Sequence, residues 1–327
     1  YVSIAERAVK KIKRKKIKQI KKYNNSFKPH EISPILRGLL SETKNLKFIV
    51  NYRSNKILDY FINGKEVRRY TGLGTATPDH VIRVKPFPLV ISPKPKSTIE
   101  DFKKLAEKCF RDYRQKYIKY FDTNKKKVKG KKTMLDTSPR VILVQNVGLF
   151  SVGDSLRAAK IAGDLTETNA RVISSVEETS KYKFIPEKDL FDVEYWSLEQ
   201  AKIKKAKKAL QGNVVVITGS FGAIGSATYK LFKSYGAEVV LLDYNLQKVK
   251  EIKSKVKDLC LHCDVTNKSS VKKAFKIITE TYGGIDILIS NAGTAIGGSI
   301  AEVDDKILRQ SFEDNFFFHQ NCVSETI

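Results

Sequence analysis

The stretch that decides the fold is NVVVITGSFGAIGSATYKLFKSYG, residues 213–236. It opens with an apolar run over 213–217, passes through the glycine-rich turn TGSFGAIG over 218–225, and continues with helical composition. A strand, a glycine turn and a helix in this order are typical of a site that binds the phosphates of a dinucleotide. The start of the helix offers free N–H groups and the positive end of its dipole to a pyrophosphate.

The three glycines of the turn have separate predicted roles. Gly219 permits the tight turn, Gly222 lets the backbone approach a pyrophosphate, and Gly225 lets the helix pack close to the strand. The predicted cofactor-binding set also includes the other loop positions Ser220, Phe221 and Ile224.

An acidic residue follows the second apolar run of this region. The run is EVVLL over 238–242, and Asp243 stands at its end. An acid about 20 residues after the glycines accepts hydrogen bonds from the ribose hydroxyls of NAD and repels the 2′-phosphate of NADP. The loop 218–225 has no Lys or Arg to bind that phosphate. The sequence therefore predicts NAD as cofactor. An alternative role for Asp243, compatible with the first, is to cap the next helix.

Further motifs extend this pattern. In order and spacing, TGSFGAIG, Asp243, the Cys263-Asp264-Val265 segment and GGIDILISNAG over 283–293 resemble the cofactor motifs of the short-chain dehydrogenase/reductase family. The resemblance implies that Asp264 and Val265 flank the adenine, and that the ribose side of the cofactor is lined by Asn291, Ala292 and Gly293. Alternatively, the Asn291 side chain only braces the central strands. The family form TGxxxGxG is altered here, because Ala223 takes the place of the middle glycine.

The last segment is predicted to be a helix over Asp304–Ile327, with Ile307, Leu308, Phe312, Phe316 and Phe317 as its apolar set. The resemblance implies that Asn315 is the catalytic Asn, which supports a lysine through a water; the alternative is an ordinary buried amide. We expect the family's Tyr-x-x-x-Lys beyond Ile327, so that residues 1–327 alone would not catalyse hydride transfer. Three local matches are interpreted as chance: Tyr52/Lys56, Tyr229/Lys233 and Tyr244/Lys248.

The pattern of the chain predicts an α/β protein with two regions. Strands and helices alternate over 210–327, which predicts the first half of a Rossmann-type doubly wound parallel sheet. Residues 1–185 are predicted as an α+β region, and residues 186–209 as a connecting segment whose part 194–208 is helical. The expected upstream elements are a helix and then a loop over 1–40, apolar runs over 48–51 and 57–62, a Pro-rich extended segment over 78–95, helices over 98–122 and 153–176, and a strand over 140–144.

The upstream region carries a second resemblance. The segments at 75–91, 131–165 and 187–202 resemble those of bifunctional rhamnulose-1-phosphate aldolase/alcohol dehydrogenases. The resemblance implies that residues 1–185 are the later part of a class II aldolase (adducin-like) region, whose zinc stabilises an enediolate. The resemblance implies that the three zinc histidines lie upstream of Tyr1. The segment NVGLFSVGDS over 146–155 resembles the zinc-ligand segment with Val147 in place of the third histidine, and it is interpreted as a degenerate second copy that cannot bind zinc. His80 is interpreted as an ordinary loop histidine or, alternatively, as a substrate contact.

Composition excludes several other classes of protein. The net charge is +26, but lysines are spread through the chain, so we predict no nucleic-acid partner. The densest cluster, 10–22, is interpreted as an amphipathic helix with a solvated lysine face; the alternative is a functional basic arm. Cys260 and Cys263 would point to opposite faces of a strand, so no metal is predicted. Four cysteines suggest a reduced, cytoplasmic protein, and the chain has no apolar run long enough for a membrane span.

The leading hypothesis is an NAD-dependent oxidoreductase fused to an aldolase (a lyase) in deoxy-sugar catabolism. Its substrate would be a small alcohol, aldehyde or sugar derivative, and the enzyme is expected to be a homo-oligomer. The alternatives are a sugar-alcohol (phosphate) dehydrogenase with a non-catalytic upstream module, and a basic protein associated with nucleic acid that uses the dinucleotide fold as a scaffold.

Overall fold

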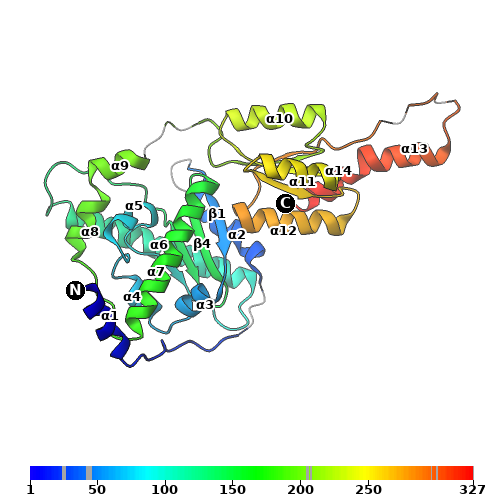
Figure 1. The fold of residues 1–327 in the computed structure, drawn as a ribbon. Helices are drawn as coiled ribbons and strands as arrows, with labels where there is room; N and C mark the ends of the chain where they lie inside the picture. The colour runs from blue at the N-terminus through cyan, green and yellow to red at the C-terminus, as the bar shows by residue number, and fades with distance from the viewer. Residues whose placement is uncertain are drawn as a thin grey trace. The chain divides into compact units, whose positions relative to one another are not determined.

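The computed structural model describes residues 1–23, 27–41, 46–203, 206, 208–295, 297–299 and 301–326 (Figure 1). The chain divides into two compact units. Unit 1 comprises Tyr1–Leu40, Asn51–Gly153 and Arg157–Lys205, and unit 2 comprises Ser41–Val50, Asp154–Leu156 and Ala206–Ile327. Two four-stranded sheets are present in the described residues, with the strand orders β1-β4-β3-β2 and β7-β6-β5-β8.

The first sheet is mixed. Its strands are β1 (Ile49–Arg53), β2 (Leu89–Ile91), β3 (Val141–Val144) and β4 (Gly148–Gly153). β3 and β4 form an antiparallel hairpin, whereas β2 runs parallel to β3 with Ile91 opposite Val144. The mixed sheet and its helices confirm the predicted α+β architecture of the upstream region.

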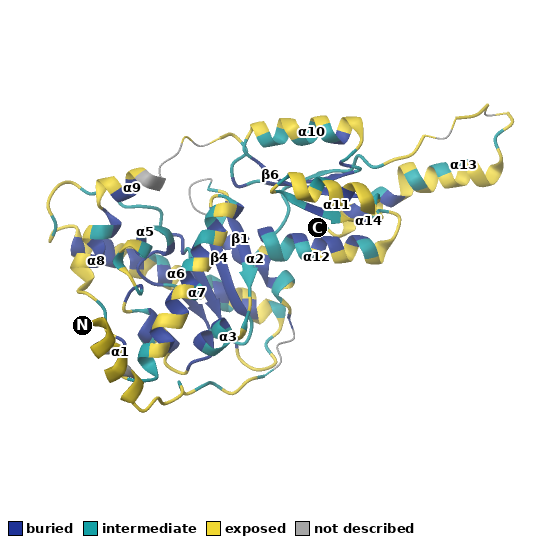
Figure 2. Ribbon diagram, in the orientation of Figure 1, coloured by how far each residue is buried: buried dark blue, intermediate teal, exposed yellow. Residues whose placement is uncertain are grey.

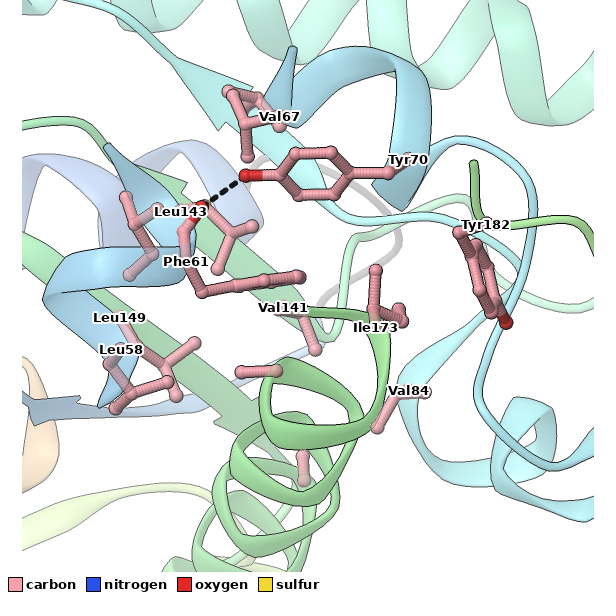
Figure 3. Close-up of a cluster of buried hydrophobic side chains, with 14 residues drawn as sticks. Leu58, Phe61, Val67, Tyr70, Val84, Val141, Leu143, Leu149, Ile173 and Tyr182 are labelled. Carbon is pink, nitrogen blue, oxygen red and sulfur yellow. Dashed lines mark hydrogen bonds between the residues drawn. The ribbon is translucent and has the colours of Figure 1, made fainter. Parts of the chain in front are cut away.

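The core of unit 1 lies where α3 (Lys56–Ile62), α4 (Val67–Thr71) and α7 (Leu156–Glu177) meet β3 and β4 (Figure 3). Tyr70 is fully buried, and its hydroxyl donates a hydrogen bond to the carbonyl oxygen of Phe61. A buried phenol needs such a partner, because an unpaired hydroxyl in an apolar core is costly. The other labelled members of the cluster are aliphatic, apart from Phe61 and Tyr182.

The predicted helix over 10–22 is wrong for most of its length. Helix α1 (Val2–Lys11) ends early, and the chain then runs extended along unit 1. The Ile17 N–H donates to the Tyr60 hydroxyl (2.7 Å) and the Ile20 N–H to the Asn63 carbonyl (2.8 Å). These tertiary hydrogen bonds, together with packing of the Ile17 side chain on the core, outweigh a modest intrinsic helix propensity.

The structure differs in part from two other upstream predictions and confirms a third. The loop expected before residue 40 contains a helix, α2 (Pro29–Ser41), while residues 24–26 lie outside the described residues. The Pro-rich segment is not extended throughout, since it contains the short helices η1 (Pro78–His80) and α5 (Val81–Val84). The long helix α6 (Ile99–Asn124) confirms its prediction, and a capping box between Thr98 and Asp101 fixes its start.

Residues 187–203, which the sequence placed in a connecting segment, form α8 (Glu187–Glu194) and α9 (Ser197–Ile203). Both helices belong to unit 1 by their contacts, and Phe191 and Glu194 are fully buried. The predicted helical stretch over 194–208 extends to residues 204, 205 and 207, which lie outside the described residues.

The second sheet is entirely parallel and confirms the predicted Rossmann-type fold. Its strands are β5 (Val214–Thr218), β6 (Glu238–Asp243), β7 (Leu259–His262) and β8 (Ile287–Ile289). The helices that alternate with them are α10 (Ala223–Ser234), α11 (Leu246–Lys255) and α12 (Lys268–Tyr282). The central strand β5 is fully buried along its length, whereas the helix α10 that follows it is largely exposed or half-buried (Figure 2). Because all strands are parallel, their carboxyl ends meet at one edge, where such folds bind their ligands.

The last segment is helical as predicted, but the side of the helix that is buried is not the predicted one. Helix α13 (Asp305–Phe312) passes into a π-helical turn, Glu313–Phe317, and then into α14 (Phe318–Ser324). The predicted apolar set is wrong, because Phe318 and Cys322 are the buried residues, whereas Ile307, Phe312, Phe316 and Phe317 are exposed and Leu308 is half-buried. The wide π turn accommodates an extra residue and so shifts the buried face. Ile327 lies outside the described residues.

Candidate functional site

The glycine loop joins the buried strand β5 to α10, and Gly222 is the N-cap residue of that helix. Gly219 has a φ of +60°, and a Cβ there would lie 2.8 Å from the Cα of Ala292. A Cβ on Gly225 would lie 2.5 Å from the Gly219 carbonyl oxygen. Both positions therefore require glycine for the fold itself. At Gly222 the nearest atom to a Cβ would be 3.5 Å away, so packing within the protein does not require glycine there.

Asp243, at the end of the neighbouring strand β6, holds this loop by hydrogen bonds. Its carboxylate is buried and accepts hydrogen bonds from the backbone N–H of Phe221 and of Asn245, each at 3.0 Å. Helix α11 is capped by Asn245, whose side chain accepts from the Lys248 N–H. The alternative role of Asp243 as the helix cap is therefore wrong. Beside it, the hydroxyl of Ser220 donates to the Leu242 carbonyl at 3.1 Å.

Asn291 braces the ends of the central strands. Its side-chain amide donates to the carbonyl oxygens of Thr218 (3.1 Å) and Gly219 (3.2 Å). The Thr218 hydroxyl in turn accepts from the backbone N–H of Asn291 and of Ala292. Asn291 therefore braces the strands, and its contact with the cofactor stays a prediction.

The remaining predicted site residues lie at the same carboxyl edge, after β7. Asp264 is exposed, and its carboxylate accepts from the N–H and the hydroxyl of Thr266 at 3.0 and 2.7 Å. The Val265 carbonyl oxygen accepts a hydrogen bond from the side chain of Asn321 on α14 (3.1 Å). Asp264 and Val265 are thus held by their own loop and by α14, and their predicted contact with the adenine stays a prediction.

Asn315 reaches the end of β8 from the π-helical turn. Its side-chain oxygen accepts from the Thr294 N–H at 3.0 Å, and its amide donates to the Ser311 carbonyl at 2.8 Å. A Cβ on Gly293 would come within 2.7 Å of that oxygen, so glycine at 293 permits the approach. Asn315 is exposed, so the alternative of an ordinary buried amide is wrong.

His319 was not among the predicted site residues, yet it contacts two residues of the site. The Nδ1 atom of His319 lies 2.5 Å from the Ser290 hydroxyl, and Nε2 lies 3.1 Å from the Asn315 carbonyl oxygen. The signal was available, since a histidine four residues after Asn315 lies on the same helical face.

Two of the Tyr-x-x-x-Lys matches have structural roles. The hydroxyl of Tyr229 and the ammonium of Lys233 both donate to Asp258, at 2.8 and 2.7 Å. Burial and the Asp258 carboxylate raise the pKa of the Tyr229 phenol. The Tyr52 hydroxyl donates to the Val147 carbonyl at 3.0 Å. In the third match Tyr244 is exposed.

Cys260 on β7 and Cys263, which follows that strand, are both buried, and burial raises the pKa of each thiol to about 11. Among the residues that the structure describes, no group of three or more His, Cys, Asp or Glu side chains could hold a metal ion. In unit 1, His80 Nδ1 lies 3.2 Å from the Asn169 side-chain oxygen, which favours the interpretation of His80 as an ordinary loop histidine.

Unit 1 contains a buried polar cluster that the sequence analysis did not anticipate. The Lys85 ammonium donates to the Asp136 carbonyl at 2.7 Å and lies 3.9 Å from a carboxylate oxygen of Glu194. The same oxygen accepts from the Tyr117 hydroxyl at 2.8 Å, and Tyr117 and Tyr195 share a further hydrogen bond. Burial lowers the pKa of Lys85 to about 8 and raises that of Glu194. The cluster links α5, α6 and α8 within unit 1.

We expect Lys85 to make the free energy of unfolding depend on pH in the alkaline range. Its folded pKa of about 8 is below its ordinary value of 10.5, so the unfolded chain binds more protons between these values. Stability should therefore rise by about 2–3 kcal/mol from pH 8 to 10.5, relative to a Lys85→Met variant. Urea unfolding followed by far-UV circular dichroism at several pH values measures this difference. Parallel pH profiles for the two proteins would contradict the prediction.

Comparison with known proteins agrees with the two-unit architecture. The family model described as "Aldolase class II, second domain" matches residues 27–203, and the model described as "short chain dehydrogenase" matches residues 213–327. The chain belongs to the class II aldolase second-domain family. In this chain, that domain is fused to a short-chain dehydrogenase domain, an oxidoreductase fold.

Individual relatives match one or both regions of this fusion. An uncharacterized oxidoreductase, YuxG of Bacillus subtilis (strain 168), is 30% identical over 287 residues, which is 84% of this chain and 41% of that protein. Short chain aldehyde dehydrogenase 1 of Euphorbia lathyris is 38% identical over 116 residues, 34% of this chain and 40% of that protein. The chain thus spans about two fifths of the length of these relatives.

A solved short-chain dehydrogenase/reductase from Brucella melitensis, titled a glucose/ribitol dehydrogenase, is 23% identical with a TM-score of 0.35. The alignment covers 37% of this chain and 53% of that structure.

Across the described parts of the chain, no helix combines the length and the apolar character that a membrane crossing requires.

Proposed function

We propose that unit 2 binds NAD and that the protein is an NAD-dependent oxidoreductase acting on a small alcohol, aldehyde or sugar derivative. The observation that carries the proposal is the position of Asp243, whose buried carboxylate holds the glycine loop at the carboxyl edge of a parallel sheet. A carboxylate at this place suits ribose hydroxyls and disfavours a 2′-phosphate.

The residues of the loop fit a dinucleotide. Gly222 is the N-cap residue of α10, so the backbone N–H groups of the first helical turn after it face the loop, and a Cβ at Gly222 would meet no atom closer than 3.5 Å. When bound, NAD supplies the hydride acceptor. The protein's part would be to hold the pyrophosphate at the loop, the adenosine ribose at Asp243, the adenine between Asp264 and Val265, and the second ribose at 291–293.

The upstream half is proposed to derive from a rhamnulose-1-phosphate-type aldolase, with the whole protein working in deoxy-sugar breakdown. The class II aldolase match to residues 27–203 supports the aldolase part of this proposal. We also propose a cytoplasmic homo-oligomer with a small-molecule substrate. The exposed side chains of Phe312, Phe316 and Phe317 support an oligomer, because clustered exposed aromatic groups are uncommon on monomers.

Direct titration tests the proposed cofactor. The purified chain should bind NADH saturably, as measured by the enhancement of nicotinamide fluorescence. Duplex DNA should bind only weakly, with an affinity that falls steeply with added salt and does not depend on sequence. A folded protein that binds neither NADH nor NADPH, or one that binds a particular DNA sequence tightly at physiological salt, would overturn the proposal.

A further inference from the structure

The segment Asn291–Gly293 is held at both of its flanks by a single helical turn. On one flank, the Thr294 N–H donates to the side chain of Asn315 at 3.0 Å. On the other flank, the hydroxyl of Ser290 lies 2.5 Å from Nδ1 of His319, whose Nε2 lies 3.1 Å from the carbonyl oxygen of Asn315. Asn315 therefore takes part in both connections, through its side chain and through its main chain.

The chemistry of these partners fixes the state of the imidazole. A carbonyl oxygen can only accept a hydrogen bond, so Nε2 of His319 must carry the proton that it shares with Asn315. In the neutral ring Nδ1 is then an acceptor, and the Ser290 hydroxyl donates to it. Each ring nitrogen thus has one defined partner, and replacing the ring by a shorter or longer amide would keep only one of them.

The π-helical turn that carries Asn315 needs hydrogen bonds from neighbouring residues to stabilise it. In the π-helical turn Glu313–Phe317, the Phe318 N–H donates to the Glu313 carbonyl, five residues back. A π turn is rare, usually occurs as a single turn inside an α-helix, and is frequent at functional sites. Phe316 and Phe317 are exposed, so their side chains do little to hold the turn against the body of unit 2.

We propose that His319 is a positioning residue, which holds Asn315 and the segment Asn291–Gly293 in register for the cofactor. The inference rests on the proposed function, because the same segment is expected to line the cofactor's ribose. His319 would act through Asn315 and Ser290, with no contact of its own to the cofactor.

Two amide substitutions separate the two bonds of the ring. His319→Gln places a donor near the position of Nε2 and keeps the bond to Asn315, whereas His319→Asn places its amide near Nδ1 and keeps only Ser290. Hydrogen–deuterium exchange of the full chain without nucleotide should rise about 3- to 10-fold over residues 313–318 in His319→Asn, the loss expected for one hydrogen bond. In His319→Gln the exchange in this turn should stay within about twofold of the wild type.

NADH affinity is the second measurement. We expect it to fall about 3- to 10-fold in His319→Asn and less in His319→Gln. Gln320→Ala, at the exposed neighbouring position, is the matched control and should change neither quantity. Equal exchange over 313–318 in wild type and His319→Asn would overturn the inference even if NADH binds. If the exchange changes as expected but the wild type binds no NADH, the proposed function fails and the contacts of His319 have only a structural role.

Discussion

Gly225→Ala is expected to abolish measurable dinucleotide binding and to destabilise unit 2 by about 1–3 kcal/mol, the usual cost of overpacking a tight contact. The added Cβ would lie 2.5 Å from the Gly219 carbonyl oxygen and 2.8 Å from the Cα of Ser220. Both are backbone atoms, so no side chain can turn away, and the helix must move from the strand. Fluorescence titration with NADH and urea unfolding measure the two effects.

Gly222→Ala is the matched variant in the same loop. Its Cβ would meet no atom closer than 3.5 Å, so packing should tolerate it, and the poorer N-cap residue should lower the free energy of unfolding by no more than about 1 kcal/mol. If a pyrophosphate lies against Gly222, NADH affinity should nevertheless drop by about tenfold or more. A variant at 222 that binds NADH normally would place the phosphates elsewhere, and normal binding by Gly225→Ala would refute the argument from close approach.

Asp243 is expected to make the protein prefer NADH over NADPH by about 30- to 100-fold. A carboxylate roughly 5 Å from a 2′-phosphate repels each unit of its charge by about 3 kcal/mol at an effective dielectric constant of about 20, and salt screens part of this repulsion. In Asp243→Asn, which removes the charge but keeps one acceptor oxygen, the preference should fall below about tenfold. Parallel fluorescence titrations with the two nucleotides measure the ratio.

The stability of the Asp243 variants must be followed together with their affinity. The carboxylate accepts from two backbone N–H groups, of Phe221 and Asn245, so its loss leaves buried donors unpaired at a cost of about 1–3 kcal/mol. Asp243→Ala should therefore weaken both nucleotides through the loop as well as changing their ratio. An unchanged ratio in Asp243→Asn, or tighter NADPH binding by the wild type, would refute the assignment of NAD.

The sequence alone was enough to predict the parallel sheet of unit 2 and the location of its loop. Strand, glycine turn and helix are contiguous over 213–236, so local propensity and hydrophobic pattern agree with the final fold. That Gly225 admits no side chain follows from the same short segment, whereas the close neighbour of Gly219 is Ala292, which is distant in sequence. Asp243 could be placed from its position at the end of a strand, although its hydrogen bonds to the loop could not.

Contacts between distant segments decided the rest, and no local pattern contains them. The extended course of residues 13–20 depends on partners in the segment 60–63. The buried cluster of Lys85, Tyr117 and Glu194 joins residues that are far apart in sequence. At the site, His319 lies beside Ser290, a residue 29 positions earlier in the chain. Local propensities differ by only tenths of a kcal/mol per residue, whereas a buried polar group left unpaired costs several times more. Tertiary hydrogen bonds therefore prevail wherever the two disagree.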